Sequence, residues 1–308
     1  TTNSNHTIAN WVAKLDLNRN IEWQRCFDSG EFVSAIQTLD NGFIMVGHKD
    51  ISGYDSQDDV WIIKLNSAGM FEWEKRYGGS GKDKGNCIIE TDDGGYLVAG
   101  STESNDGDIS KSNGYLNSPD AWLIKLTHDG SIKWERTYGG NFIDAAMKVI
   151  KKNDGGYIFV GYSGWDFQEV KHSGHGSLDA WFVELNNEGM GQRQYFYGGS
   201  KEDLGFDIVQ TIDNGYFILG KSNSNNYDVV GMHVDSIDQG DIWALKLDKF
   251  GDIEWQKCIG GSGWELPVSV FQSQNGNYIL SGCTSSKDGD IKGNHNYGPP
   301  DDPHDILV

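Results

Sequence analysis

The segment formed by residues 120–140, DAWLIKLTHDGSIKWERTYGG, decides the fold. It contains two short runs of strand-forming residues joined by the polar link THDG, and each run carries one tryptophan, Trp122 and Trp134. Aliphatic and aromatic residues in runs this short favour β-strands. A link of this length joins antiparallel neighbours, because parallel strands need a much longer crossover. The segment therefore predicts a β-hairpin.

The same phrase occurs five times in the chain. Its first tryptophan recurs at spacings of 50, 61, 59 and 62 residues, at Trp11, Trp61, Trp122, Trp181 and Trp243. A second tryptophan stands twelve positions after the first at Trp23, Trp73, Trp134 and Trp255, and Arg193 replaces it in the fourth copy. A fixed internal spacing at such a period is the signature of a repeat architecture.

Each copy contains two further strand-like runs after the tryptophan phrase. In the second copy these are residues 86–90 and 96–100, separated by the turn Asp92-Asp93-Gly94-Gly95. Glycine supplies the positive φ that such hairpins require. The apolar runs are interrupted by Gly, Asn or Asp too often for a helix, so we expect almost none. Four antiparallel strands per repeat predict an all-β fold. Such units could form a propeller, a sandwich stack or an open solenoid, and the strand count favours a β-propeller of four-stranded blades.

The repeat also predicts the domain organisation, a single propeller over residues 1–308. Its copies span approximately 11–60, 61–121, 122–180, 181–242 and 243–304, and 305–308 begin a further strand. The chain starts with the third and fourth strands of a unit and ends with the first and second, so its two ends could complete one shared blade and remove exposed sheet edges. The extra strand leaves six blades open, and five is the favoured number.

The amino-acid composition limits which classes of binding partner are expected. The formal net charge is −20, with 45 acidic against 25 basic side chains, which repels phosphate backbones and anionic lipids. No apolar run approaches the ~20 residues that span a bilayer. We therefore expect no nucleic acid, no membrane insertion and a monomeric domain. The four cysteines form no close pair, so no disulfide framework or zinc site is expected.

The repeat resembles the SBBP-type β-propeller repeats of secreted and surface proteins, especially of Bacteroidetes. The matching segments are residues 120–122, 130–134, 138–140, Asp144, 154–157 and 288–290. The resemblance covers 10–308 and implies an exported, noncatalytic surface or adhesion module. It implies an extracellular or cell-surface location, although the polar start of the given chain has no signal-peptide pattern.

The loop lengths predict a binding face. The links between the second and third strands reach roughly twenty residues in copies two to five, whereas the hairpin turns are tight. On the long-loop side, the fourth-to-first-strand links end in an acidic residue: Glu31, Asp83, Asp144, Asp203 and Glu265. These carboxylates could bind a cation or a cationic group. Alternatively, each anchors its own Gly-Gly-Ser turn by hydrogen bonds.

Two further sets of residues are candidate ligand contacts. The Asp-Gly-Asp loops place Asp106 with Asp108, and Asp288 with Asp290, where they could contribute to a Ca²⁺ site. The alternative is ordinary turn stabilisation by the aspartates, and no cofactor is required. Trp165 and Trp264 fall outside the repeat register, so they could stack on a sugar or peptide, or pack locally.

No catalytic motif stands out: the chain has no Gly-x-Ser-x-Gly, no His-Glu-x-x-His and no phosphate-binding loop. The sequence therefore predicts a noncatalytic recognition or adhesion module that binds glycan or protein through its long-loop face, and not an enzyme. One alternative is a structural spacer propeller without a ligand of its own. Another is a polysaccharide-active hydrolase or lyase, which would need two carboxylates in different environments.

Overall fold

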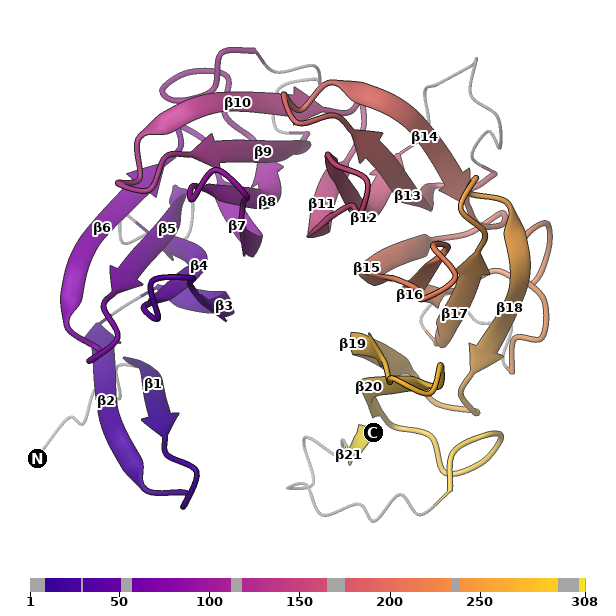
Figure 1. Cartoon of the computed structure of the whole chain (residues 1–308). Helices are drawn as coiled ribbons and strands as arrows, with labels where there is room; N and C mark the ends of the chain where they lie inside the picture. The colour runs from indigo at the N-terminus through magenta and orange to yellow at the C-terminus, as the bar shows by residue number, and fades with distance from the viewer. Residues whose placement is uncertain are drawn as a thin grey trace, which may run out of the picture. The chain divides into compact units, whose positions relative to one another are not determined.

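The computed structural model describes residues 9–28, 30–50, 57–111, 118–164, 175–233, 239–292 and 305–307. Every regular element in these ranges is a β-strand (Figure 1). The strands are β1 (Ala9–Leu15), β2 (Ile21–Asp28), β3 (Glu31–Gln37), β4 (Phe43–Asp50), β5 (Asp58–Leu65), β6 (Phe71–Tyr77), β7 (Asp83–Glu90), β8 (Tyr96–Thr102), β9 (Asp120–Leu126), β10 (Ile132–Tyr138), β11 (Asp144–Lys151), β12 (Tyr157–Gly164), β13 (Leu178–Leu185), β14 (Gly191–Tyr197), β15 (Asp203–Gln210), β16 (Tyr216–Ser222), β17 (Asp241–Leu247), β18 (Ile253–Ile259), β19 (Glu265–Gln272), β20 (Tyr278–Thr284) and β21 (Asp305–Leu307). The described part of the chain has no helix that could span a membrane.

The strands form antiparallel sheets in chain order, as the repeat predicted. Four sheets have four strands each: β3–β6, β7–β10, β11–β14 and β15–β18. Two smaller sheets remain: a two-stranded sheet, β1–β2, and a three-stranded sheet, β19–β21. The chain is an all-β propeller-type protein with four-stranded antiparallel sheets in series, and its number of strands fits five blades. The prediction of fold class and strand pattern is confirmed.

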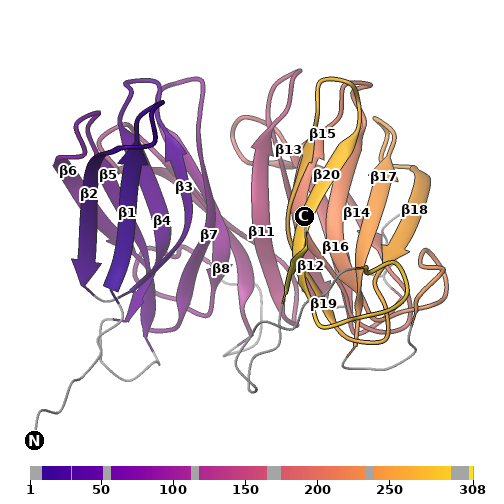
Figure 2. The same ribbon diagram turned by 90° about the horizontal axis from the view of Figure 1, so that it is seen from below.

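The chain divides into two compact units, Thr1–Tyr138 and Gly139–Val308. In the second unit the sheets β11–β14, β15–β18 and β19–β21 follow one another, and their first strands β11, β15 and β19 are neighbours in turn. The strands of this unit are aligned along a common axis and alternate in direction, with their connections at the two ends (Figure 2). One end carries the tight hairpin turns and the other carries the longer links.

The last strand occupies the position that the repeat assigns to a third strand. β21 pairs antiparallel with β20, with Gly282 opposite Leu307 and Thr284 opposite Asp305. In the complete sheets the same glycine of the second strand faces the first tryptophan of the phrase, as Gly161 faces Trp181. β21 therefore lies in the register of a third strand beside β20.

In the four complete sheets the first tryptophan of the phrase is the centre of the packing, whereas Trp11 in β1 is exposed. Trp61, Trp122, Trp181 and Trp243 are fully buried. Each indole N–H donates to a side-chain oxygen on the neighbouring fourth strand, at 2.7 Å to Glu74, 2.9 Å to Glu135, 3.2 Å to Gln194 and 2.9 Å to Gln256. A buried indole needs such a partner. The hairpin register places the acceptor thirteen residues after the tryptophan in each case.

The lysine of the tryptophan phrase fastens the tight turns. Lys125 is buried, and its ammonium donates to Asp93 at 2.8 Å, in the turn between β7 and β8. Asp93 also accepts from Thr91 at 2.6 Å, and these contacts hold the pKa of its carboxyl well below the usual range against the opposing effect of burial. Lys64 and Lys246 make the same kind of contact, with Asp40 at 2.8 Å and Asp213 at 3.0 Å. A buried charge is tolerated because it is paired and hydrogen-bonded.

Buried tyrosines bridge consecutive sheets. Tyr197 at the end of β14 is fully buried, and its hydroxyl donates to the Gly251 carbonyl at 2.6 Å in the turn between β17 and β18. Tyr197→Phe removes the donor and leaves the carbonyl without it, so we expect the free energy of unfolding to fall by about 1–2 kcal/mol. Denaturant unfolding measures this. Tyr227→Phe, at an exposed side chain, is the control and should change stability by no more than about 0.5 kcal/mol; an equal loss in both variants would contradict the assignment.

Candidate functional site

The acidic residues predicted on the long-loop side lie at the starts of first strands. Asp83, Asp144, Asp203 and Glu265 are fully buried, whereas Glu31 is exposed. Backbone amides of the preceding turns donate to three of them: Gly79 to Asp83 at 2.8 Å, Gly140 to Asp144 at 2.8 Å and Gly199 to Asp203 at 2.6 Å. Asp83, Asp144 and Asp203 therefore anchor their turns, which is the alternative that the sequence left open, whereas Glu265 accepts from Thr284 Oγ1 at 2.7 Å in the adjacent strand β20.

A second buried carboxylate faces several of these anchors. Asp179, at the start of the third strand β13, is buried, and a Cβ added at Gly198 would lie 2.2 Å from its Oδ1 and 2.8 Å from Asp203 Oδ2. Asp241 and Glu265 flank Gly260 in the same way, and Asp59 and Asp83 flank Gly78. Burial raises the pKa of Asp179 to about 7, and the charge of Asp203 adds to the rise. Asp59 is half-buried, whereas protein covers the other five carboxylates, so a saccharide cannot reach those five.

The Asp-Gly-Asp loops also hold turns in place. Asp106 Oδ1 accepts from the Ser80 amide at 2.7 Å, and Asp288 Oδ1 accepts from the Ser262 amide at 2.6 Å. The backbone amides of Asp108 and Asp290 donate to the carbonyls of Gly78 and Gly260. Among the described residues, no group of three or more His, Cys, Asp or Glu side chains could hold a metal ion. Calcium binding at these loops stays a prediction.

The two tryptophans outside the repeat register have different outcomes. Trp165 lies outside the described residues. Trp264 is half-buried, and its backbone amide donates to Ser285 Oγ at 2.8 Å.

The four cysteines are free thiols: Cys26, Cys87, Cys258 and Cys283.

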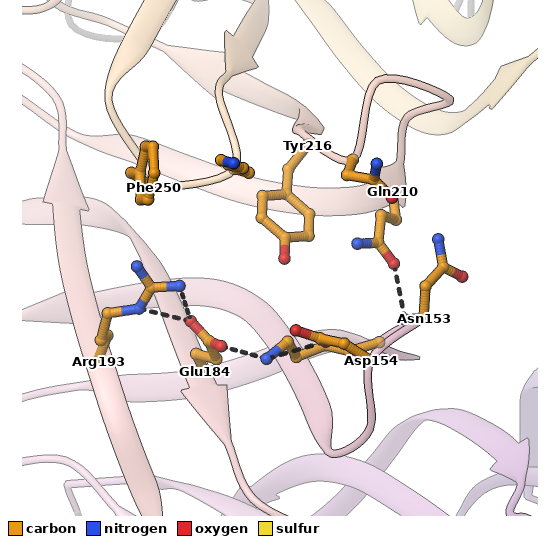
Figure 3. Close-up of a pocket in the computed structure, with 10 residues that line it drawn as sticks. Asn153, Asp154, Glu184, Arg193, Gln210, Tyr216 and Phe250 are labelled. Atoms are coloured by element: carbon orange, nitrogen blue, oxygen red, sulfur yellow. Dashed lines mark hydrogen bonds and ion pairs between the residues drawn. The ribbon is translucent and has the colours of Figure 1, made fainter.

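The structure has a pocket that the sequence interpretation did not propose. It lies at the tight-turn end of the strands, where the sheets β11–β14 and β15–β18 meet, and its volume is about 400 Å³ (Figure 3). Its lining residues come from both sheets: Lys152, Asn153, Asp154, Glu184, Arg193, Gln210, Asn214, Tyr216, Lys249 and Phe250. The binding face was expected at the opposite, long-loop end.

The pocket coincides with a break in the repeat. Where the other complete sheets have the buried lysine of the phrase, β13 has Glu184. Lys152 stands in the turn position held elsewhere by Thr38, Thr91 and Thr211, and Arg193 replaces the second tryptophan. Three coordinated exchanges in one copy reverse the charges of this cluster. Opposite charges still meet in this copy. The Glu184 carboxylate lies between two cations, where other copies have a lysine ammonium between carboxylates.

The lost tryptophan explains why the pocket exists. In neighbouring sheets the second tryptophan packs against the aromatic residue that begins the second strand of the next sheet: Trp73 against Tyr96 at 6.2 Å between ring centroids, and Trp255 against Tyr278 at 6.0 Å. In sheets β11–β14 and β15–β18 the equivalent positions are occupied by Arg193 and Tyr216. A guanidinium that turns toward Glu184 does not fill the volume of an indole, so an opening remains beside Tyr216.

Glu184 is the centre of the charge cluster. Arg193 Nε donates to its Oε2 at 2.7 Å, and the ammonium of Lys152 contacts its Oε1. Lys152 also contacts Asp154 Oδ1 at 3.3 Å, so one ammonium joins two carboxylates (Figure 3). Burial by itself lowers the pKa of Lys152, but the hydrogen bond to Glu184 outweighs it, and the pKa is raised. The Glu184 side chain is 7% exposed and that of Asp154 is 76% exposed, so the carboxylates have different environments.

Tyr216 adds a hydroxyl to the pocket. Figure 3 shows its ring between the two sheets, with the hydroxyl directed toward the side that holds Glu184 and Asp154. Burial, followed by the charge of Glu184, raises the pKa of Tyr216, which keeps the hydroxyl protonated at neutral pH. The pocket can therefore offer a neutral donor, two carboxylates and several cationic groups to a polar ligand.

The signal for this site was present in the sequence. The exchange of the second tryptophan for Arg193 was visible, but its connection to Lys152 and Glu184 requires the three positions to be aligned along the repeat. In a repeat protein, a copy that changes several interior positions at once indicates a local requirement that its neighbours do not have.

No family model matches the chain, and no curated protein sequence matches it either. Solved structures do. A protein of unknown function from Bacteroides caccae is 10% identical, with 81% of this chain and 90% of that chain covered and a TM-score of 0.41. The levansucrase of B. megaterium is 8% identical, with coverage of 87% and 81% and a TM-score of 0.46. The alpha-L-arabinofuranosidase of Lactobacillus brevis is 10% identical, with coverage of 84% and 84% and a TM-score of 0.41.

These matches correct two expectations from the sequence. The chain was expected to be a noncatalytic recognition module and not an enzyme, whereas two of the three structures carry the names of enzymes. The expectation followed from the absence of local catalytic motifs. Carboxylates that act as a pair can come from distant positions in the sequence, so a search for short motifs does not detect them.

Proposed function

We propose that the chain is a polysaccharide-active enzyme that cleaves glycosidic bonds in the pocket between β11–β14 and β15–β18. The observation that carries the proposal is that Lys152 joins two carboxylates of contrasting exposure, Glu184 and Asp154, in a pocket of about 400 Å³. Two carboxyl groups on one ammonium have a separation on the order of the 5–5.5 Å that retaining glycosidases use.

The exposure of the two carboxylates suggests their roles. Asp154 is the more exposed of the two, so we assign it the role of the acid that protonates the leaving glycosidic oxygen. Glu184 is held in one orientation by Arg193 and Lys152, and its carboxylate attacks the anomeric carbon as the bond to the leaving oxygen breaks. Water then cleaves the glycosyl ester and gives its proton to Asp154, which restores both groups.

The direct test is turnover of a polysaccharide panel, with arabinan, xylan, levan, pectin and alginate as substrates. New reducing ends report hydrolysis, and the ultraviolet absorbance of an unsaturated product reports elimination by a lyase. Asp154→Asn and Glu184→Gln are expected to lower kcat by about 10³-fold. Absence of turnover on the whole panel, or full activity of both variants, would overturn the proposal.

Two control variants separate chemistry from folding. Asp93→Asn changes the residue that corresponds to Asp154 in the β7–β8 turn, outside the pocket, and should leave activity unchanged. The triple variant Lys152→Thr, Glu184→Lys and Arg193→Trp restores the residues of the other copies. We expect it to fold, because the other sheets are built this way, and to be inactive, because it fills the pocket. An active triple variant would place catalysis elsewhere.

The family and the location belong to the same proposal. The repeat segments that resemble SBBP-type propellers support an exported protein that meets its polysaccharide outside the cell. The full-length gene tests this part, since a signal peptide or a sorting domain in it would support export.

A further inference from the structure

The pocket has the opposite charge balance from the rest of the chain. The chain has 45 acidic and 25 basic side chains, whereas the pocket has three basic residues, Lys152, Arg193 and Lys249, against the two carboxylates Glu184 and Asp154. Field lines in a cavity with low-dielectric walls are concentrated at its charged groups. An anionic group is therefore favoured at this place on a protein that otherwise repels anions.

Two of these cations differ in what they already contact. Lys152 is committed to Glu184 and Asp154. Arg193 uses Nε and one terminal nitrogen on Glu184, and its side chain is 39% exposed. A guanidinium has five N–H donors in a planar fork, so Arg193 can bind a second carboxylate while it holds Glu184.

Lys249 and Phe250 form the opposite wall. They stand in the turn between β17 and β18, and the Lys249 ammonium lies 4.9 Å from the centre of the Phe250 ring. Among the described residues, no carboxylate forms an ion pair with Lys249. Phe250 is exposed, so its ring offers an apolar platform beside a cation.

This wall is also a departure from the repeat. The positions of Lys249 and Phe250 are occupied by Ser67 and Ala68 in the β5–β6 turn, by His128 and Asp129 in the β9–β10 turn, and by Asn187 and Glu188 in the β13–β14 turn. A lysine followed by an aromatic residue occurs at this turn position only in the copy that faces the altered cluster. Exchanges on both sheets thus converge on one pocket.

We propose that the saccharide bound here carries a carboxylate, as a uronic acid does, and that Lys249 and Arg193 select for it while the sugar ring lies against Phe250. Cleavage of this saccharide rests on the proposed function, whereas selection for its charge is a property of binding alone. Lys249 and Arg193 are the specificity-determining residues, and Phe250 positions the ring.

Calorimetric titration of the whole chain tests the selection directly. The probes are oligogalacturonate and oligoglucuronate, each with its carboxyl-reduced neutral counterpart, at low and at high NaCl concentration. We expect an acidic form to bind at least tenfold more tightly than its neutral counterpart. The difference should shrink at high salt, because the ion pairs are partly exposed.

Variants identify the groups responsible. Lys249→Gln should weaken binding of the acidic form about tenfold and leave the neutral form unchanged. Lys287→Gln, at an exposed lysine in a loop after β20, should change neither. The inference is overturned if acidic and neutral forms bind equally, if no acidic probe binds, or if Lys249→Gln has no effect. Salt-sensitive binding of the acidic form without cleavage would refute the proposed function and leave this inference standing, whereas cleavage of neutral chains alone would do the reverse.

Discussion

Gly161→Ala is expected to lower the free energy of unfolding by about 3 kcal/mol or more. Gly161 lies in β12 opposite both Ala146 of β11 and Trp181 of β13. A Cβ at this position would lie 1.8 Å from the Ala145 carbonyl oxygen, a distance that no rotamer change can relieve because both atoms are bound to backbone. The first strand has a register irregularity between Ala146 and Lys148. The strand bulges toward the glycine, which only a residue without a side chain permits.

A matched glycine in the same sheet provides the control. Gly191 begins β14, and no atom lies within 4 Å of the position where its Cβ would be. Gly191→Ala should change stability by no more than about 0.5 kcal/mol. Denaturant unfolding of both variants, followed by far-ultraviolet circular dichroism, measures the difference. Equal stability of Gly161→Ala and the original chain would show that the two strands separate at little cost, contrary to the argument.

The second large effect concerns the pH dependence of stability. Burial raises the pKa of Asp179 to about 7 from its ordinary value of 3.8. Between these two pH values the folded chain retains a proton that the unfolded chain has lost. The free energy of unfolding therefore falls as pH rises through this window, and the contribution is fully present below pH 3.8 and fully lost above pH 7.

Asp179→Asn should remove most of this dependence. The amide cannot ionise, and its oxygen can still accept from the His175 amide. At pH 8 the variant is expected to be more stable than the original chain by up to about 4 kcal/mol. At pH 4 the two should be within about 1 kcal/mol of each other. Urea unfolding of both proteins across this range measures the difference, and parallel stability curves would contradict the assignment.

Asp203→Asn is expected to act in the opposite direction. Asp203 accepts from the Gly199 amide at 2.6 Å, from Ser224 Oγ at 2.7 Å and from Ser222 Oγ. An amide group has one oxygen, so its N–H₂ would face a donor. The variant should lose about 1–3 kcal/mol at both pH values. Burial also raises the pKa of Asp203, although its hydrogen bonds oppose the rise. The direction of the stability change at pH 8 therefore distinguishes the two carboxyls.

Local patterns in the sequence were sufficient for the strands and their order. The four runs of each copy, the tight turns at Asp93 and Asp213, and the hairpin of the tryptophan phrase all appear where the alternation and the turn residues predicted them. These features depend on neighbours close in sequence: glycine and aspartate close a turn, and a short link forces antiparallel pairing. Repetition makes the same local rule visible several times.

The roles of the carboxylates were not predictable in the same way. Glu31 and Asp83 stand at the same position of the repeat, yet Glu31 is exposed and Asp83 is fully buried. Burial depends on which sheet covers the residue, which is a long-range property. The sequence could list both the ligand reading and the turn reading of these acids, and the packing of each sheet decides what each carboxylate can contact.

The sequence by itself determined an all-β chain of four-stranded antiparallel units, because that outcome depends on local residue patterns repeated at a fixed period. Tertiary structure alone decided where a ligand can bind. Lys152, Glu184 and Arg193 come from three strands or turns of one sheet, and Lys249 and Phe250 come from the next. Their side chains meet only when both sheets are folded and packed, because a pocket is the volume that packing leaves unfilled at the place where Arg193 stands instead of a tryptophan.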